Sequence, residues 1–258
     1  MPKSLRTFLE DCRREIPNEV VHVTKEVDPA HYDVTAIIKH LGAMKKFPIL
    51  VFDRPLNLHG RASSDFKLVM NCEISQRKTQ IALGVPKEMN RTQMAEVCLE
   101  REEHRVLPAI VDKKQAPVKE VVKAGKDVDM FELPIMRHHY MDGGPYVVLS
   151  TVTKDRKSGI YNCSYHRMEI KSRNTTALYA SPRHLWKIFR DHEDNNLECP
   201  VATVLGHHPA YHMGACYSGP FAVSEYEVIG GYLQEPLRLT ASETWGEDFL
   251  IPADAEIV

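Results

Sequence analysis

Three short segments in the second half of the chain gather side chains that can bind ions or phosphate. The segment YNCSYHR (161–167) contains Asn162, the segment SPRH ends in His184, and the segment VSEYEVIGG contains Glu225. An amide oxygen, an imidazole and a carboxylate together form a mixed set of ligands. Such a set suits Mn²⁺ or Mg²⁺ bridging to a phosphate better than it suits structural zinc. The three residues are therefore candidate metal ligands.

The segment 161–167 is predicted to be a strand with an unusually large share of polar residues. Asn162, Ser164, His166 and Arg167 occupy both of its faces, which indicates that one face meets a ligand instead of a core. The alternative is an edge strand that faces water. Strict alternation places Asn162 and Arg167 on opposite faces of a strand. A single site that uses both would need a bulge or a strand end between them.

A helix over residues 181–193 is predicted to present its N-terminus to an anion. Ser181 is a suitable N-cap and Pro182 a suitable first helical residue, which puts His184 in the first turn. A helix N-terminus attracts anions, and Arg183 adds a charge that suits phosphate. The alternative is an ordinary cap with a surface histidine.

Composition and missing motifs exclude several other classes. The net charge of -2 argues against nucleic-acid binding and against a polybasic membrane binder. Eight of the 13 histidines lie between positions 138 and 212, but HExxH and CxxC are absent, so neither structural zinc nor a metal-dependent hydrolase is favoured. No G-x-S-x-G elbow, phosphate-binding loop or dinucleotide fingerprint occurs. Six scattered cysteines, no signal peptide and no long apolar run predict a cytoplasmic protein without a membrane span.

The elements that must position these residues divide the chain into two parts of an α+β protein. Residues 1–115 are predicted to form an α/β domain, and residues 116–258 a β-rich second domain resembling a barrel or sandwich. Only one clear helix, 181–193, interrupts the second part. The helices and strands predicted in the first part are a helix from Ser4 to Pro17, a strand at 19–27, a helix from Pro29 with Gly42 past its end, a strand at 47–52 and a helix at 89–103.

An ordered series of segments along the whole chain resembles the UbiD-type decarboxylases, which use prenylated FMN. The series includes KEVDPAHYDVTAI, LPIMRHHYMDGGPY, TKDRKSGIYNCSYHRMEI, SPRHLWKI, GHHPAYHMGA, SEYEVIGGYLQEPLRL and IPADAEIV. Their order and spacing are more specific than any single motif. The resemblance implies that residues 1–115 are the N-terminal α/β domain. It implies that residues 116–258 are a flavin-reductase-like split β-barrel that binds prenylated FMN and is incomplete at its C-terminal end.

The resemblance also implies roles for the polar residues. By this similarity, the ligands of a divalent metal, Mn²⁺ or Mg²⁺, that clamps the cofactor phosphate are Asn162, His184 and Glu225. The residues implied to contact the cofactor are Asn162, Ser164, Tyr165, His166, Arg167, Arg183, His184 and Glu225. Arg167 matches the catalytic arginine that engages the substrate carboxylate. A potassium ion near Ala215 and Tyr217 is implied by a looser match.

The implied activity is the reversible non-oxidative decarboxylation of an aromatic, heteroaromatic or α,β-unsaturated carboxylic acid. Decarboxylation at an sp² carbon needs an electron sink, which the prenylated flavin supplies. The pair Tyr165 and His166 favours an aromatic or heteroaromatic substrate. The alternative is a truncated flavin-binding module without catalytic activity that acts with a partner chain. A flavin prenyltransferase as cofactor supplier and a homo-oligomeric full-length protein are also implied.

The sequence departs from the family pattern at its end. In relatives, two catalytic glutamates lie in an EGPFGE-like segment beyond the AEIV motif, and a C-terminal oligomerisation domain follows. Glu256 belongs to the AEIV motif and does not match either acid. We therefore expect that this chain alone lacks the proton donor and the C-terminal domain, and that it is inactive alone.

Overall fold

The first part of the chain is a three-stranded sheet flanked by helices. In the computed structural model, which describes residues 1–63 and 65–258, β1 and β2 are parallel and β3 runs antiparallel to β2. All four residues of β2 are buried, because the segment ILVF is apolar on both faces. The elements of this part are α1 (Leu5–Glu15), β1 (Val20–Val23), α2 (Asp33–Ala43), β2 (Ile49–Phe52), β3 (Leu68–Met70), α3 (Gln76–Leu83), α4 (Arg91–Glu103) and β4 (Ala109–Ile110).

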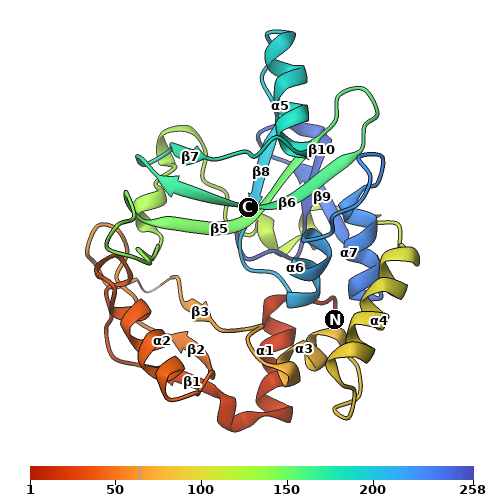
Figure 1. Ribbon diagram of the computed structural model, residues 1–258. Coiled ribbons are helices and arrows are strands. Elements are labelled where there is room, and N and C mark those ends of the chain that lie inside the picture. Colours follow the sequence, from red (N-terminus) through yellow and green to blue (C-terminus); the bar gives the residue numbers. More distant parts are fainter. Residues whose placement is uncertain (64) are drawn as a thin grey trace.

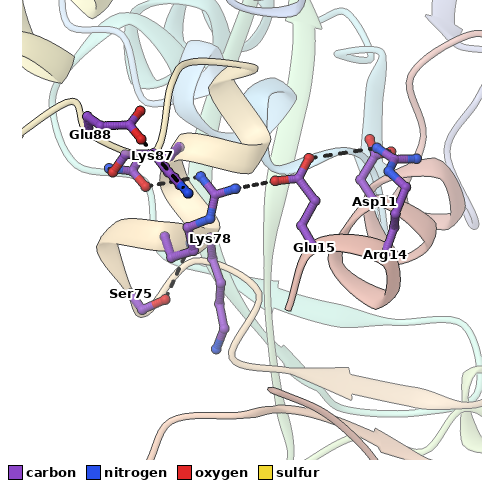
Figure 2. Close-up of polar contacts among 9 residues, drawn as sticks. Asp11, Arg14, Glu15, Ser75, Lys78, Lys87 and Glu88 are labelled. Carbon is purple, nitrogen blue, oxygen red and sulfur yellow. Dashed lines mark hydrogen bonds and ion pairs between the residues drawn. The ribbon is translucent and has the colours of Figure 1, made fainter. Parts of the chain in front are cut away.

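The first predicted helix is confirmed. Ser4 caps α1 and forms a capping box with Thr7, and α1 buries an apolar face against β2. Glu15 at its last turn accepts a hydrogen bond from Arg77 of α3. Figure 2 shows Glu15 beside the pair of Arg14 and Asp11. Helices α1 and α3 are therefore joined by polar contacts at the surface as well as by apolar packing.

The second predicted helix begins later than expected, and its predicted end was wrong. Pro29–His31 form a separate 3₁₀ turn, capped by the side chain of Asp28. Tyr32 then adopts a left-handed conformation with φ of 72°, so α2 starts only at Asp33. Gly42 lies inside α2 rather than past its end. The polar cap on the 3₁₀ turn outcompetes the favourable placement of proline at a helix start.

The second part contains two sheets, and Figure 1 shows α5 projecting from the four-stranded one. The order β7-β6-β5-β8 is antiparallel throughout, while β9 pairs antiparallel with β10 and parallel with β4. A mixed helix-and-sheet fold is therefore confirmed, and closure into a split barrel stays a prediction. The elements of this part are β5 (Tyr146–Lys154), β6 (Tyr161–Ile170), β7 (Thr176–Leu178), α5 (His184–Asp194), β8 (Val201–Val204), α6 (Pro209–Ala215), α7 (Glu225–Leu233), β9 (Arg238–Ser242) and β10 (Gly246–Pro252).

Two helices in the second part, α6 and α7, were not predicted. Nearly every residue of α7 is buried, so its sequence lacks the polar residues at helical spacing that would indicate a helix. The glycine pair in α7 permits close packing: a Cβ at Gly230 would lie 2.5 Å from the carbonyl oxygen of Val106, and one at Gly231 would lie 2.4 Å from that of Arg101. The expectation of a single interrupting helix was therefore wrong.

Helix α6 connects the two parts of the molecule. Figure 1 shows α6 between the sheet of β5 and β6 and the helices α1 and α3. A Cβ on Gly214 would lie 2.7 Å from the Cα of Ile229, so α6 packs closely against α7. At its start, His208 caps the helix by accepting a hydrogen bond from Ala210 N, and its ring meets Phe8 of α1 edge-on. Buried histidine therefore lies at the contact between the two parts.

Acid is expected to weaken the fold through His208. Burial, together with the nearby charges of Lys3 and His212, lowers the pKa of His208 from 6.5 to about 3. Below pH 6.5 the histidine takes up a proton in the unfolded chain but not in the folded one, which favours unfolding. The free energy of unfolding is therefore fully present above pH 6.5 and decreases as the pH falls toward 3. At pH 5 the loss is roughly 2 kcal/mol, at about 1.4 kcal/mol per pH unit.

The matched variant is His208→Asn, because asparagine keeps the helix cap but does not titrate. The free energy of unfolding is measured in urea at pH 8 and pH 5 for both proteins. The wild type should lose about 2 kcal/mol more than the variant between these pH values. Equal losses in the two proteins would show that His208 does not titrate in this way.

Candidate functional site

Strand β6 has an open edge along most of its length. It pairs with β5 from Tyr161 to Glu169 without a register shift, and β7 covers its other edge only at Met168, Glu169 and Ile170. Among the described residues, no strand pairs with that edge between positions 161 and 167. Backbone groups on this edge are therefore available to a side chain or a ligand.

Glu225, the first residue of α7, reaches this open edge. Its Oε1 accepts a hydrogen bond from Asn162 Nδ2 at 3.1 Å, and its Oε2 accepts one from Cys163 N at 3.1 Å. Because the N–H of Cys163 points away from β5, the alternation of an antiparallel ladder points the backbone groups of Tyr165 and Arg167 the same way. The predicted proximity of Asn162 and Glu225 is therefore seen directly in the structure.

The carboxyl group of Glu225 is buried without a cationic partner. The residue is 3 % exposed, and burial raises the pKa of Glu225 from 4.5 to about 7, against smaller lowering effects of its hydrogen bonds. Across residues 1–63 and 65–258, no lysine, arginine or histidine forms an ion pair with it. A cation bound beside this carboxyl group would favour its ionised form.

His184 lies near the same region, although its helix begins later than predicted. Helix α5 starts at His184 with Arg183 as an uncapped N-cap, because Arg183 is extended and its N–H bonds to Ser181 O. The predicted roles of Ser181 as N-cap and Pro182 as first helical residue were therefore wrong. The ring of His184 meets Phe221 edge-on at 5.2 Å, four residues before Glu225.

The chemical state of His184 suits a ligand role. Burial lowers the pKa of His184, and the charges of Lys187 and Arg183 lower it further, which favours the neutral imidazole that binds metals. Helix α5 also contacts both β5 and β6. The structure thus brings Asn162 and Glu225 into direct contact, and His184 begins a helix that contacts the strand of Asn162.

The face of β6 that carries Asn162 holds a strip of polar groups. Ser164 Oγ bonds to His166 Nε2 at 2.9 Å and donates to Asn162 Oδ1 at 3.3 Å. Opposite them on β5, Thr151 pairs with Ser164 and Thr153 with Asn162. Both threonine hydroxyls are fully buried and have no hydrogen-bond partner among the described residues. Buried hydroxyls without partners are costly unless a ligand or water satisfies them.

The two threonines were missed by the sequence analysis. The segment STVTK places hydroxyls two residues apart and therefore on one face of a strand, which was the available signal. The surrounding apolar residues of β5 obscure this signal, because they predict a strand buried on both faces.

Arg167 lies apart from this strip. The uninterrupted register leaves no bulge, so Arg167 projects from the face opposite Asn162, about 17 Å further along the strand. The side chain is exposed and forms no ion pair in the described part of the chain. An open edge, however, is bordered by side chains from both faces. A ligand lying along the edge can therefore contact side chains from either face of the strand.

The remaining predicted cofactor residues line the same edge or lie close to it. Tyr165 is half-buried, and its ring meets that of His212 on α6. His166 bonds to Tyr179 O at 3.4 Å, and burial lowers the pKa of its ring. Arg183 is exposed at the start of α5.

The structure shows only part of the two predicted metal sites, the divalent site and the potassium site. In the described residues, no three His, Cys, Asp or Glu side chains form a group that could hold a metal ion. The predicted divalent site includes an asparagine and so contains only two such residues. Ala215 is buried at the end of α6, and the potassium site near Ala215 and Tyr217 stays a prediction.

The fold and the site together define an α+β protein with a buried carboxyl–amide pair at the open edge of an antiparallel sheet. Residues 109–258 match the 3-octaprenyl-4-hydroxybenzoate carboxy-lyase Rift-related domain, and residues 12–97 match the N-terminal domain of the same enzymes. The chain belongs to the UbiD family. The resemblance inferred from the ordered segments is thereby confirmed.

Characterised relatives of the chain are decarboxylases. It is 28% identical over 262 residues to a phenolic acid decarboxylase of Streptomyces sp. (strain D7), covering 98% of this chain and 53% of the relative. It is 30% identical over 162 residues to an anhydromevalonate phosphate decarboxylase of Methanothermobacter thermautotrophicus, covering 60% of this chain and 38% of the relative. The chain spans about half the length of the first of these relatives and less of the second.

Solved structures show the same fold. The UbiD-class enzyme HmfF from Pelotomaculum thermopropionicum in complex with FMN superposes with a TM-score of 0.86 at 29% identity, covering 98% of this chain and 53% of that one. An evolved dimeric form of HmfF in complex with prFMN gives the same TM-score at 28% identity, with 98% and 55% covered. Both related structures therefore hold a flavin.

Proposed function

We propose that the chain binds prenylated FMN along the open edge of β6 and serves the reversible non-oxidative decarboxylation of an aromatic, heteroaromatic or α,β-unsaturated carboxylic acid. The observation that carries the proposal is the contact of Glu225 with Asn162 and with the backbone of Cys163 at that edge. Family membership and the flavin-bound relatives support it.

The residues present fit a divalent cation next to a phosphate. Asn162, His184 and Glu225 would hold Mn²⁺ or Mg²⁺, because an amide oxygen, a neutral imidazole and a buried carboxylate are suitable donors. Glu225 is buried without a charged partner, which supports this assignment. A cation bound beside it would offset the free-energy cost of ionising the buried carboxyl group. The spare hydroxyls of Thr151 and Thr153 border the same strip and could bind water or a ligand oxygen.

The cofactor would lie against Ser164, Tyr165, His166 and Arg183. When bound, prenylated FMN supplies the electron sink that decarboxylation at an sp² carbon requires. The chain's own residues would hold and orient the reactants: Arg167, exposed beside the edge, would bind the substrate carboxylate by paired hydrogen bonds. The rings of Tyr165 and His166 favour a substrate with an aromatic or heteroaromatic ring.

Assembly, cofactor supply and location belong to the same proposal. The dimeric form of HmfF supports a homo-oligomer, and use of prenylated FMN implies a flavin prenyltransferase as supplier. Over residues 1–63 and 65–258, no helix has the length and apolar character needed to cross a membrane. We propose a cytoplasmic location from the scattered cysteines.

The proposal is tested by adding FMN, or prenylated FMN, and Mn²⁺ to the purified chain. We expect a one-to-one complex that survives gel filtration with the visible absorption of a bound flavin. Release of CO₂ from a panel of aryl and enoic acids then tests catalysis. Flavin binding without CO₂ release is the result that we expect of this chain alone. Binding of an aryl acid to the flavin complex would then favour the decarboxylase over the alternative, a flavin-binding module that acts with a partner chain. No flavin binding under any of these conditions would contradict both functions.

A further inference from the structure

The ring of His212 lies between an acid of the first part and a tyrosine at the open edge. His212 Nδ1 contacts Glu73 Oε1 at 2.8 Å. The imidazole ring of His212 also contacts the ring of Tyr165 edge-to-face, with 5.8 Å between the two ring centroids and an interplanar angle of 67°. Among the described residues, no hydrogen bond joins His212 Nε2 to another group. Glu73 therefore fixes one nitrogen of a ring that contacts Tyr165.

Glu73 is itself held by a rigid turn between β3 and α3. Asn71 adopts a left-handed conformation with φ of 67°, and its side chain donates to Pro48 O at 3.1 Å. The buried ammonium group of Lys78 donates to Asn71 O at 3.1 Å and also to Phe47 O. Figure 2 shows Ser75 capping the start of α3, with the Lys78 side chain extending away from it. These contacts hold the backbone of the turn that carries Glu73 in place.

The backbone of His212 is fixed from the other side. The close approach of Gly214 to Ile229 locks α6 against α7, the helix that begins with Glu225. His212 therefore has a set distance from the carboxyl–amide pair as well as from Glu73. The hydrogen bond between Glu73 and His212 joins the first part of the molecule to the wall of the candidate flavin site.

We propose that Glu73 and His212 form a positioning pair that holds the ring of Tyr165 against the open edge of β6, where a planar heteroaromatic ligand would lie. Hydrogen bonding of Nδ1 to Glu73 restrains rotation of the imidazole. The edge-to-face contact then favours one orientation of the tyrosine ring. The inference rests on the proposed function only in naming a flavin as that ligand, because the placement of Tyr165 does not depend on it.

A fluorine probe on Tyr165 tests the pair directly. The full chain is prepared with 3-fluorotyrosine at position 165 alone, and its ¹⁹F resonance is recorded for the wild type and for Glu73→Gln and His212→Ala. We expect both variants to move the resonance toward that of an exposed tyrosine. His22→Ala is the matched control, since His22 of β1 contacts Asp53, the residue that follows β2, at 3.0 Å and away from this edge. Unchanged resonances in both variants would overturn the inference.

Titration with FMN and Mn²⁺ separates the inference from the proposed function. We expect FMN to shift the resonance of the wild type, and the dissociation constant for FMN to rise several-fold in Glu73→Gln and to stay the same in His22→Ala. A resonance that responds to the two variants but not to FMN would support the positioning of Tyr165 and contradict the flavin site. A resonance that responds to FMN, with equal affinity in Glu73→Gln and wild type, would support the flavin site and overturn the role of the pair in ligand binding.

Discussion

Replacing Glu225 with glutamine is expected to abolish the Mn²⁺-dependent retention of FMN by the chain. Glu225 supplies the carboxylate at the open edge of β6, and its two oxygens also orient Asn162 and the backbone of Cys163. Glutamine keeps the shape but removes the charge that a divalent cation needs. Because even outer partners of metal ligands contribute roughly 10- to 100-fold to affinity, loss of a ligand should weaken metal-dependent binding by at least about 100-fold.

The fold should tolerate this replacement. Burial holds the pKa of Glu225 at about 7, so a large share of the groups is already neutral at neutral pH. A neutral amide of similar volume therefore adds no buried charge.

The measurement is equilibrium dialysis of FMN with and without Mn²⁺ at fixed ionic strength. Glu227→Gln is the control, because it makes the same change two residues further along the first turn of α7. Equal Mn²⁺-dependent affinity in Glu225→Gln and the wild type would remove Glu225 from the metal site.

The residue types of the candidate site could be predicted from the sequence, but their contacts could not. Asn162 and Glu225 are 63 positions apart, and their contact depends on α7 beginning beside the edge of β6. Local patterns cannot show this, because the pairing of distant elements is decided by the whole fold. The same reason explains why the open edge itself was not foreseen: it exists because β7 pairs only with the last residues of β6.

Local sequence signals failed where two favourable interactions competed. Pro29 and Pro182 both occupy positions suited to a helix start, yet α2 begins at Asp33 and α5 at His184. In the first case the side chain of Asp28 closes a separate turn, and in the second Arg183 stays extended. Where no such competition exists the local pattern was reliable, because the helix predicted from Ser4 to Pro17 is α1, with Ser4 as its N-cap.

Replacing Arg167 with alanine is expected to weaken binding of an aromatic acid strongly while leaving the flavin in place. The Arg167 side chain is exposed and forms no ion pair in the part of the chain that the structure describes, so its guanidinium group is available to a carboxylate. Paired charge-assisted hydrogen bonds contribute about 1.5–3 kcal/mol each. Their loss should weaken binding of an aromatic acid by roughly 100-fold or more.

Acid binding is measured from the perturbation of the flavin absorption spectrum. Arg167→Lys is expected to restore only part of the affinity, because lysine keeps the charge but cannot form the paired hydrogen bonds. Arg173→Ala is the control, since Arg173 is another exposed arginine that instead pairs with Asp129. Arg167 lies on the opposite face of β6 from Asn162, so this experiment also tests whether one ligand can lie along the edge and contact both faces. Undiminished acid binding in Arg167→Ala would confine the site to the face of Asn162.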